Sequence, residues 1–361
     1  MQAYKKRGFW VGLGVFFLIL LSPNPESLSS IGWAVAAVTL LMAIWWATEA
    51  VPVAVTALLP LALFPMLHVA DFKTAALPYA NPNIYLFMGG FILALGIESS
   101  GLHKRLALKM LIAIGNSGAK LVGGFMLVSA LISMWVMNTS TTLMLLPIGL
   151  AVCASVAETI PNFSSKERKN FETSLLLGIA YAASIGGMST LVGTAPNIIF
   201  VGFMQETYGT EISFVDWMKL GVPIASIMLF ASWYAITKIV YPVHFVASME
   251  TKLQLQNMLS DLGALGKDEK KVLIIFSLAA SAWMFRTLLD NFLPLSGLTD
   301  AGIAIFAALS FFFIPSENNK TDLLTWEQAN KLPWGLLVLF GGGLSLAASI
   351  GSSGLGDWIG Q

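Results

Sequence analysis

The stretch from Leu86 to Leu102 reads LFMGGFILALGIESSGL, and it recurs as LFGGGLSLAASIGSSGL from Leu339 to Leu355. The two copies are identical at 11 of 17 positions and start 253 positions apart. This similarity indicates that the chain arose by duplication of a membrane-embedded half. Folds built from two such halves place their substrate where the repeats meet, so the repeat predicts a transporter. The residues equivalent to those that follow the first copy would lie beyond Gln361. We therefore expect the second half to be incomplete here.

The composition predicts an all-α polytopic membrane protein. Hydrophobic residues make up 56% of the 361 residues, charged residues only 11%, and the mean hydropathy is +0.76. That leaves too little polar surface for a soluble globule. Runs that approach or exceed the roughly 20 apolar residues of a spanning helix lie near 8–21, 31–47, 51–67, 84–99, 121–157, 174–203, 214–240, 272–290, 298–315 and 333–350. No basic cluster is interleaved with aromatic residues, so we expect the lipid bilayer and no nucleic acid among the partners.

The basic residues assign an orientation to these runs, because Lys and Arg are enriched in cytoplasmic loops. With Lys5, Lys6 and Arg7 inside, the N-terminus is cytoplasmic and most other basic loop residues fall on the same side. This orientation is consistent only if the segment 121–157 enters and leaves the membrane on the same face. We therefore expect a re-entrant hairpin with two arms of 15 to 17 residues, each too short for a full bilayer core. The expected location is the inner cell membrane, with multiple passes.

An odd number of crossings then separates the two copies of the repeat, which predicts an inverted-repeat secondary transporter with a re-entrant hairpin and broken helices. We expect residues 1–120 to form the scaffold part of the first repeat and residues 121–240 its transport part. Residues 241–271 would form a cytoplasmic amphipathic connector, for which a simple solvated linker is the alternative. Residues 272–361 would form the scaffold part of the second repeat, whose own transport part is missing from this chain.

Two polar interruptions in the apolar background predict a binding site. The first is Asn138-Thr139-Ser140-Thr141-Thr142 at the hairpin tip, and the second is the run from Ser189 to Asn197. In the second, Gly193 frees the backbone, Pro196 breaks the helix, and helix is expected to resume at Ile198. A broken helix exposes N–H groups that can hold an anion without Arg or Lys. Its free carbonyls suit a hard cation such as Na⁺.

Side-chain oxygens of Ser133, Asn138 and Thr194 would complete such a cation site. The alternative is that Ser and Thr side chains bond back to their own helices and that the small residues mark close helix packing. We consider this alternative weaker for the two clusters together than for an isolated hydroxyl residue.

The few charged residues in apolar runs do not form a catalytic constellation. Two short stretches, Thr48-Glu49-Ala50 and Thr299-Asp300-Ala301, hold matching places in the two repeats. A structural or snorkelling role for Glu49 and Asp300 is favoured over a proton relay. Arg286 and Asp290 lie four positions apart and are predicted to pair on one helix face. The sequence has no His-Glu-x-x-His motif and no carboxylate pair with room for water, so an enzyme is not expected.

Three motifs resemble the divalent-anion/sodium symporter family, which carries dicarboxylates, citrate or sulfate. They are SMWVMNTSTTLMLLPIG (133–149), SIGGMSTLVGTAPNIIF (184–200) and PWGLLVLFGGGLSLA (333–347). The resemblance implies paired inverted repeats, two re-entrant hairpins, a scaffold that forms a homodimer, and a transport domain that moves like an elevator. The family's second hairpin signature does not occur in these 361 residues.

The resemblance also implies roles for individual residues. In the family, a Ser-Asn-Thr signature at the hairpin tip contacts a substrate carboxylate and coordinates sodium. Asn138 and Thr139 match it, whereas Met137 stands at the Ser position. The implied sodium shell is therefore Ser133, Met137, Asn138 and Gly193, with Met137 able to contribute only its backbone carbonyl. The implied substrate contacts are Asn138, Thr139, Thr194 and Pro196.

The leading hypothesis is sodium-coupled symport of a small dicarboxylate, most simply a C4-dicarboxylate such as succinate or malate, by elevator-type alternating access. An anion exchanger or a proton-coupled carrier on the same fold is the alternative, which the replacement at Met137 favours. A third interpretation is a truncated membrane fragment that does not transport.

Overall fold

A computed structural model describes residues 3–113, 117–160, 163–246, 249–286, 288–289, 297–317 and 321–360. Within these ranges the regular elements are helices, apart from two isolated β-bridges. The chain divides into two compact units, one of residues 1–88, 198–212 and 332–361, the other of residues 89–197 and 213–331. These units do not follow the boundaries predicted for scaffold and transport parts, and that division stays a prediction.

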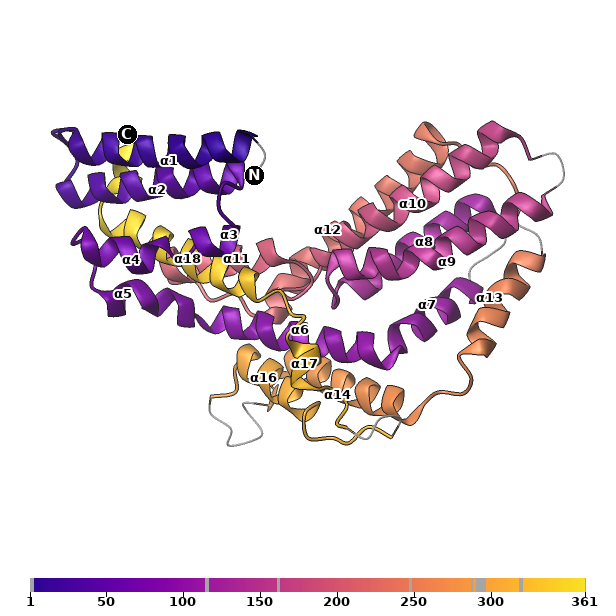
Figure 1. Ribbon diagram of the computed structural model, residues 1–361. Coiled ribbons are helices and arrows are strands. Elements are labelled where there is room, and N and C mark those ends of the chain that lie inside the picture. Colours follow the sequence, from indigo (N-terminus) through magenta and orange to yellow (C-terminus); the bar gives the residue numbers. More distant parts are fainter. Residues whose placement is uncertain are drawn as a thin grey trace. The chain divides into compact units, whose positions relative to one another are not determined.

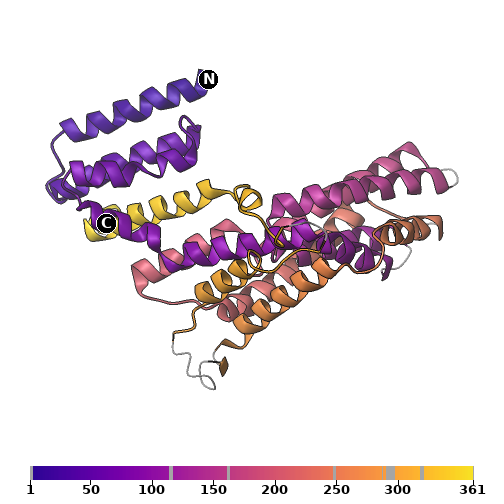
Figure 2. The same cartoon turned by 60° about the horizontal axis from the view of Figure 1, so that its bottom comes forward.

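The first unit is built on a pair of long helices, α1 (Ala3–Leu21) and α2 (Ser30–Thr48), which lie side by side in both views (Figure 1 and Figure 2). Trp45 of α2 is buried and stacks on Phe9 of α1 with ring centroids 5.2 Å apart. The unit also contains α3 (Val53–Thr56), α4 (Leu59–Met66), α5 (Phe72–Ala76), the 3₁₀ helix η1 (Leu77–Ala80), α18 (Trp334–Ser352), α19 (Leu355–Gly360) and most of α11 (Ala195–Tyr208). Helix α18 packs against η1, α2, α3 and α4.

The repeated stretches adopt the same local structure. The first copy lies in α6 (Pro82–Ser100) and the second in α18, and both helices have 19 residues. Each helix is followed by a glycine in the left-handed region, Gly101 with φ +77° and Gly354 with φ +75°. Such a residue is the usual end of a helix, because glycine adopts positive φ without a steric cost. The sequence repeat is thus a structural repeat at this level, whereas its inversion in a membrane stays a prediction.

The predicted match between Thr48-Glu49-Ala50 and Thr299-Asp300-Ala301 is wrong as a structural equivalence. Glu49 ends α2 in the left-handed conformation (φ 46°), while Asp300 begins α16 (Asp300–Ser310) with Thr299 as its N-cap. Asp300 also pairs with Arg286, Nη1 to Oδ1 at 3.3 Å. The partner predicted for Arg286, Asp290, lies outside the described residues.

The second unit is centred on three long helices, α8 (Gly118–Ser133), α9 (Asn138–Thr159) and α10 (Ser165–Gly187), which pack together along their length (Figure 1). Their contact is a continuous apolar core in which Val122, Phe125, Leu145 and Leu175 are fully buried. Helices α7 (Leu102–Ala113), α12 (Phe214–Tyr234), the π-helical η2 (Ala235–Val240) and α13 (Met249–Asp261) pack against these three. The unit also contains α14 (Lys267–Met284), α16 and α17 (Trp326–Ala329).

The hairpin between α8 and α9 turns at Met134–Met137, which is earlier than predicted. The polar run from Asn138 to Thr142 forms the first turns of α9 rather than the connection, and α9 therefore has 22 residues. Hydroxyl residues are tolerated inside a helix when they bond back to the preceding turn, as Thr142 Oγ1 does to the Asn138 carbonyl at 2.8 Å. The prediction of two short arms is therefore wrong for α9, and partial membrane depth stays a prediction.

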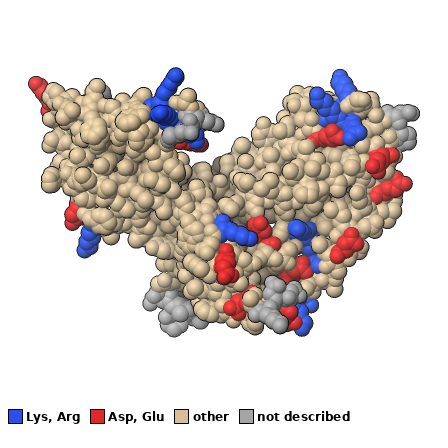
Figure 3. All heavy atoms as spheres, viewed as in Figure 1, with Lys and Arg blue, Asp and Glu red and all other residues tan. Residues whose placement is uncertain are grey.

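Five described helical stretches are long and apolar enough to cross a membrane: Ser30–Thr48, Phe72–Ser100, Asn138–Thr159, Phe214–Val240 and Trp334–Ser352. Val53–Met66, Gly118–Ser133 and Asp300–Ser310 are apolar but shorter. Most atoms on the face drawn in Figure 3 belong to residues that carry no charge, as a membrane chain requires. The predicted connector contains α13, which packs against α7 and α9 through buried Thr251 and Leu255. Helix α14 already begins at Lys267, five residues before the boundary predicted from hydropathy.

Candidate ion and anion site

The tip of the α8–α9 hairpin brings two predicted site residues together. Ser133 is the last residue of α8, and its side chain is fully buried. Its hydroxyl donates to Oδ1 of Asn138, the first residue of α9, at 2.7 Å. The same hydroxyl lies 3.4 Å from the carbonyl oxygen of Val136 in the turn. Three oxygen atoms from one tight turn therefore lie close together, as the sequence predicts for Ser133 and Asn138.

The second half of the site is a helix break between α10 and α11. Helix α10 ends at Gly187, residues 188–194 form turns, and α11 begins at Ala195. The break is where the sequence predicts it, but helix resumes at Ala195 and not at Ile198. The reason is that Pro196 falls in the first turn of α11, where a helix needs no N–H donor from that residue.

Asn197 organises the carbonyl groups of this break. Its side chain is buried and its Nδ2 donates to the carbonyls of Gly187 at 2.9 Å and Thr190 at 2.6 Å. The hydroxyl of Thr190 in turn donates to the Met134 carbonyl in the hairpin turn. The two bonds from Asn197 therefore hold the helix break itself in shape, and the bond from Thr190 joins it to the hairpin turn.

Two glycines let the two segments approach each other. A Cβ atom added to Gly187 would overlap Oδ1 of Asn138, and one added to Gly193 would overlap the Gly187 carbonyl oxygen. The Ser133 hydroxyl, the Asn138 amide oxygen and the backbone at Gly187 and Gly193 thus form one compact group of oxygen ligands. Gly193 is buried, as an ion ligand at this position would be.

The ligand set fits a hard monovalent cation. It consists of hydroxyl, amide and carbonyl oxygens without an acidic side chain, which is the donor type that Na⁺ sites use. Within the described ranges there is no group of three or more His, Cys, Asp or Glu residues that could hold a metal ion. The Met137 carbonyl, predicted as an ion ligand, accepts the Thr141 N–H at 2.9 Å as the first bond of α9. Only its second lone pair remains for an ion.

The residues predicted to contact substrate lie at the solvent-accessible edge of the same group. Thr139 and Pro196 are exposed, and Asn138 and Thr194 are half-buried. Two helices start here, α9 after Met137, which makes no side-chain cap hydrogen bond, and α11 with Pro196 in its first turn. Helix N-termini present N–H groups and positive dipole ends, so this edge can bind a carboxylate. Ser140, which the sequence did not single out, donates from its hydroxyl to Glu98 at 2.9 Å.

Sequence reasoning gave no individual role to four residues that shape the site: Gly187, Thr190, Asn197 and Trp217. Trp217 of α12 donates its indole N–H to the Met188 carbonyl at 2.9 Å. Thr190 and Asn197 belong to the polar run that flagged the break, so a buried Asn next to a helix break was an available signal. Nothing in the sequence distinguishes Gly187 or Trp217 from packing residues, because their role depends on which segment folds beside them.

Comparisons with known proteins show which family the sequence matches. Residues 6–361 match the family model described as the sodium:sulfate symporter transmembrane region. The chain is 41% identical over 362 residues to the sodium-dependent dicarboxylate transporter SdcS of Staphylococcus saprophyticus, covering 98% of this chain and 69% of that protein. It is 39% identical over 358 residues to the protein of the same name from Staphylococcus aureus, with the same coverage of both chains.

Proposed function

Because this chain belongs to the sodium:sulfate symporter family, we propose that it couples the movement of Na⁺ to the import of a small dicarboxylate. Its similarity to two sodium-dependent dicarboxylate transporters supports this substrate class and the coupling ion. The family is one of transporters, which agrees with the transport function, rather than an enzymatic one, expected from the sequence. Within this class we propose a C4-dicarboxylate such as succinate or malate.

The observation that carries the proposal is the hydrogen bond between Ser133 and Asn138, 2.7 Å long and packed against the backbone of Gly187. In the proposed mechanism the Ser133 hydroxyl keeps its proton but turns it away, and Na⁺ takes the place of the O–H group as the partner of the Asn138 amide oxygen. Ser133, the Gly193 carbonyl and the Met137 carbonyl complete its shell. The bound ion then holds the two helix starts in place for a carboxylate at Asn138, Thr139, Thr194 and Pro196. Substrate affinity therefore rises with sodium concentration.

We further propose that a homodimer in the inner cell membrane carries out this transport by elevator motion, with the N-terminus in the cytoplasm. The predicted membrane topology requires Lys120 and Lys166 to lie on the same face of the membrane. Cys153 is the only cysteine of the sequence and is buried, so single-cysteine reporters at positions 120 and 166 can be made in a Cys153→Ser background. Labelling of both from the cytoplasmic side only is expected, and labelling from opposite sides contradicts the hairpin.

Uptake into proteoliposomes tests the function directly. Labelled succinate, malate, citrate and sulfate would each be offered with an inward sodium gradient, and again with potassium in its place. The expected result is sodium-dependent uptake of the C4-dicarboxylates. Equal uptake without sodium, driven by counterflow against unlabelled anion, would instead support an exchanger.

A matched pair of serines on α8 provides the control. Ser129 and Ser133 are both fully buried, but Ser129 donates to the Ile179 carbonyl in the helix core at 2.8 Å. Ser133→Ala should raise the sodium concentration for half-maximal uptake, while Ser129→Ala should affect only stability. Equal effects of the two substitutions would remove Ser133 from the ion site.

A further inference from the structure

The first turn of α12 touches both halves of the candidate site. On one side Trp217 donates its indole N–H to the Met188 carbonyl in the break after α10. On the other side Phe214, the first residue of α12, is fully buried in an aromatic cluster that reaches the hairpin tip. The position of this one turn therefore affects both segments that supply oxygen ligands.

The aromatic cluster connects Phe214 to the turn between α8 and α9. Phe214 stacks on Trp283 of α14 with centroids 4.7 Å apart and an interplanar angle of 8°. Trp135, in the hairpin turn between Ser133 and Asn138, stacks on the same Trp283 at 6.2 Å and 11°. Trp135 also meets the edge of Phe276 at 5.0 Å. Stacked aromatic pairs of this kind add to the free energy of burial and restrict the orientation of each ring.

Asp300 holds this cluster together at its base. Its Oδ2 accepts the backbone N–H of Phe214 at 2.9 Å, and its own backbone carbonyl accepts the indole N–H of Trp283 at 3.0 Å. The residue is only 9% exposed, with Arg286 Nη1 at 3.3 Å from its Oδ1. A carboxylate that accepts from a helix N-terminus makes a charge-assisted bond that the helix dipole strengthens. Asp300 thus fixes the two rings, Phe214 and Trp283, on which the hairpin turn rests.

We infer that Asp300 is a positioning residue of the ion site, which it holds in shape through Phe214, Trp283 and Trp135. The inference rests on the sodium-coupled function proposed above. Loss of the acceptor for the Phe214 N–H should loosen the first turn of α12 and with it the Ser133 to Asn138 geometry. The affinity for sodium then falls, although Asp300 does not touch the ion.

The test measures sodium binding to the purified protein without substrate, by calorimetric titration with NaCl at a total salt concentration held constant with KCl. The midpoint is the sodium concentration at half-saturation, and melting temperatures are measured in parallel in NaCl and in equimolar KCl. Asp300→Ala should raise this midpoint about tenfold, the effect of losing one hydrogen bond to a charged group. Asp300→Asn keeps an amide oxygen for the Phe214 N–H and should stay within about threefold of wild type. A purely structural role would lower the melting temperature in both salts and leave the midpoint unchanged.

Asp216→Ala is the matched control, since Asp216 is an exposed acid in the same turn that pairs with Lys219 at 2.8 Å. It should leave the midpoint unchanged. A wild-type protein with no sodium-specific shift overturns the proposed function itself. A wild-type response together with an unchanged midpoint for Asp300→Ala overturns the positioning role alone. Should Asp300→Ala fail to fold, Trp283→Phe removes the indole donor to Asp300 and part of the stacked ring surface, and an unchanged midpoint there overturns the inference.

Discussion

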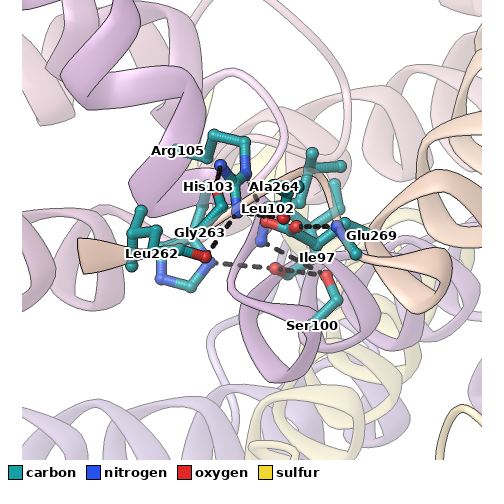
Figure 4. Close-up of polar contacts among 10 residues, drawn as sticks. Ile97, Ser100, Leu102, His103, Arg105, Leu262, Gly263, Ala264 and Glu269 are labelled. Carbon is teal, nitrogen blue, oxygen red and sulfur yellow. Dashed lines mark hydrogen bonds and ion pairs between the residues drawn. The ribbon is translucent and has the colours of Figure 1, made fainter. Parts of the chain in front are cut away.

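Arg105 donates from Nε to Oε1 of Glu269 at 2.8 Å, across 164 positions of sequence, and both side chains are about nine-tenths buried. The rest of the guanidinium group donates to the carbonyls of Leu262, Gly263 and Ala264 at 2.8 to 3.1 Å (Figure 4). One side chain of α7 thus binds the loop between α13 and α14 and the first turn of α14. The planar fork of arginine is suited to such a task, because several of its donors are fixed relative to one another.

Arg105→Lys should destabilise the protein, since an ammonium group can keep the pair with Glu269 but cannot reach three carbonyls at once. Loss of those hydrogen bonds should lower the free energy of unfolding by about 1–3 kcal/mol, and Arg105→Ala by about 3–5 kcal/mol because it leaves Glu269 buried and unpaired. Thermal unfolding in detergent measures both. Arg168→Lys is the control: Arg168 pairs with Glu172 at 2.8 Å on an exposed helix face, and no change is expected there.

The same pair should make stability depend on pH. Burial alone would raise the pKa of Glu269, but hydrogen bonds from Arg105 and from the Gly266 N–H hold it below its ordinary value of 4.5. A lowered pKa in the folded state means that the stabilisation is complete above about pH 4.5 and is lost as the pH falls through the folded value. The difference in melting temperature between wild type and Glu269→Gln should therefore be constant at neutral pH and shrink in acid. A difference that stays the same down to pH 3 would contradict the ion pair.

Asn138→Ala should abolish sodium-dependent uptake while leaving the amount of folded protein in the membrane unchanged. The substitution removes the oxygen that accepts from Ser133 and faces Gly187. Asn138 is only half-buried at a helix start, so its loss should cost little packing. Uptake at wild-type rates would exclude Asn138 from the site.

Met137→Ser should lower the sodium concentration needed for half-maximal uptake. The hydroxyl would stand next to Asn138 and add a side-chain oxygen where only the second lone pair of the Met137 carbonyl is free. Serine is also a better N-cap than methionine for α9, so a rise in melting temperature is expected without sodium as well. An unchanged sodium dependence would show that this side chain lies outside the ion shell.

Gly187→Ala should weaken sodium-dependent uptake severely, because the new methyl group would overlap the Asn138 amide oxygen. Either Asn138 or the end of α10 must then move, and the ion site is distorted in both cases. Gly14→Ala on α1 is the control, since an added Cβ there meets no atom within 4 Å. It should leave uptake unchanged, and helix propensity favours alanine there by roughly 1 kcal/mol.

Much of the site could be predicted because it follows from local chemistry. Polar residues in an apolar run, a Gly-Thr-Ala-Pro-Asn break and the resemblance to a family indicated Ser133, Asn138 and Gly193, and the structure brings these residues together. The start of α11 was misplaced by three residues because hydropathy marks where apolar residues resume, whereas Pro196 is already compatible with the first helical turn. The length of α9 was underestimated for the same reason, since hydroxyl side chains at a helix start look like a loop in a hydropathy profile.

The sequence by itself determined that this is a helical membrane protein with an internal repeat, because both properties are written in composition and periodicity along the chain. It also determined where the helices break, since Gly, Pro and clustered polar residues act on their own local backbone. Only the tertiary structure decided that Asp300 pairs with Arg286 and that Trp135 stacks on Trp283. It also decided that Asn197 donates to the free carbonyls at the helix break. These contacts join segments that folding brings close, and their free energy depends on burial and geometry that no local pattern encodes.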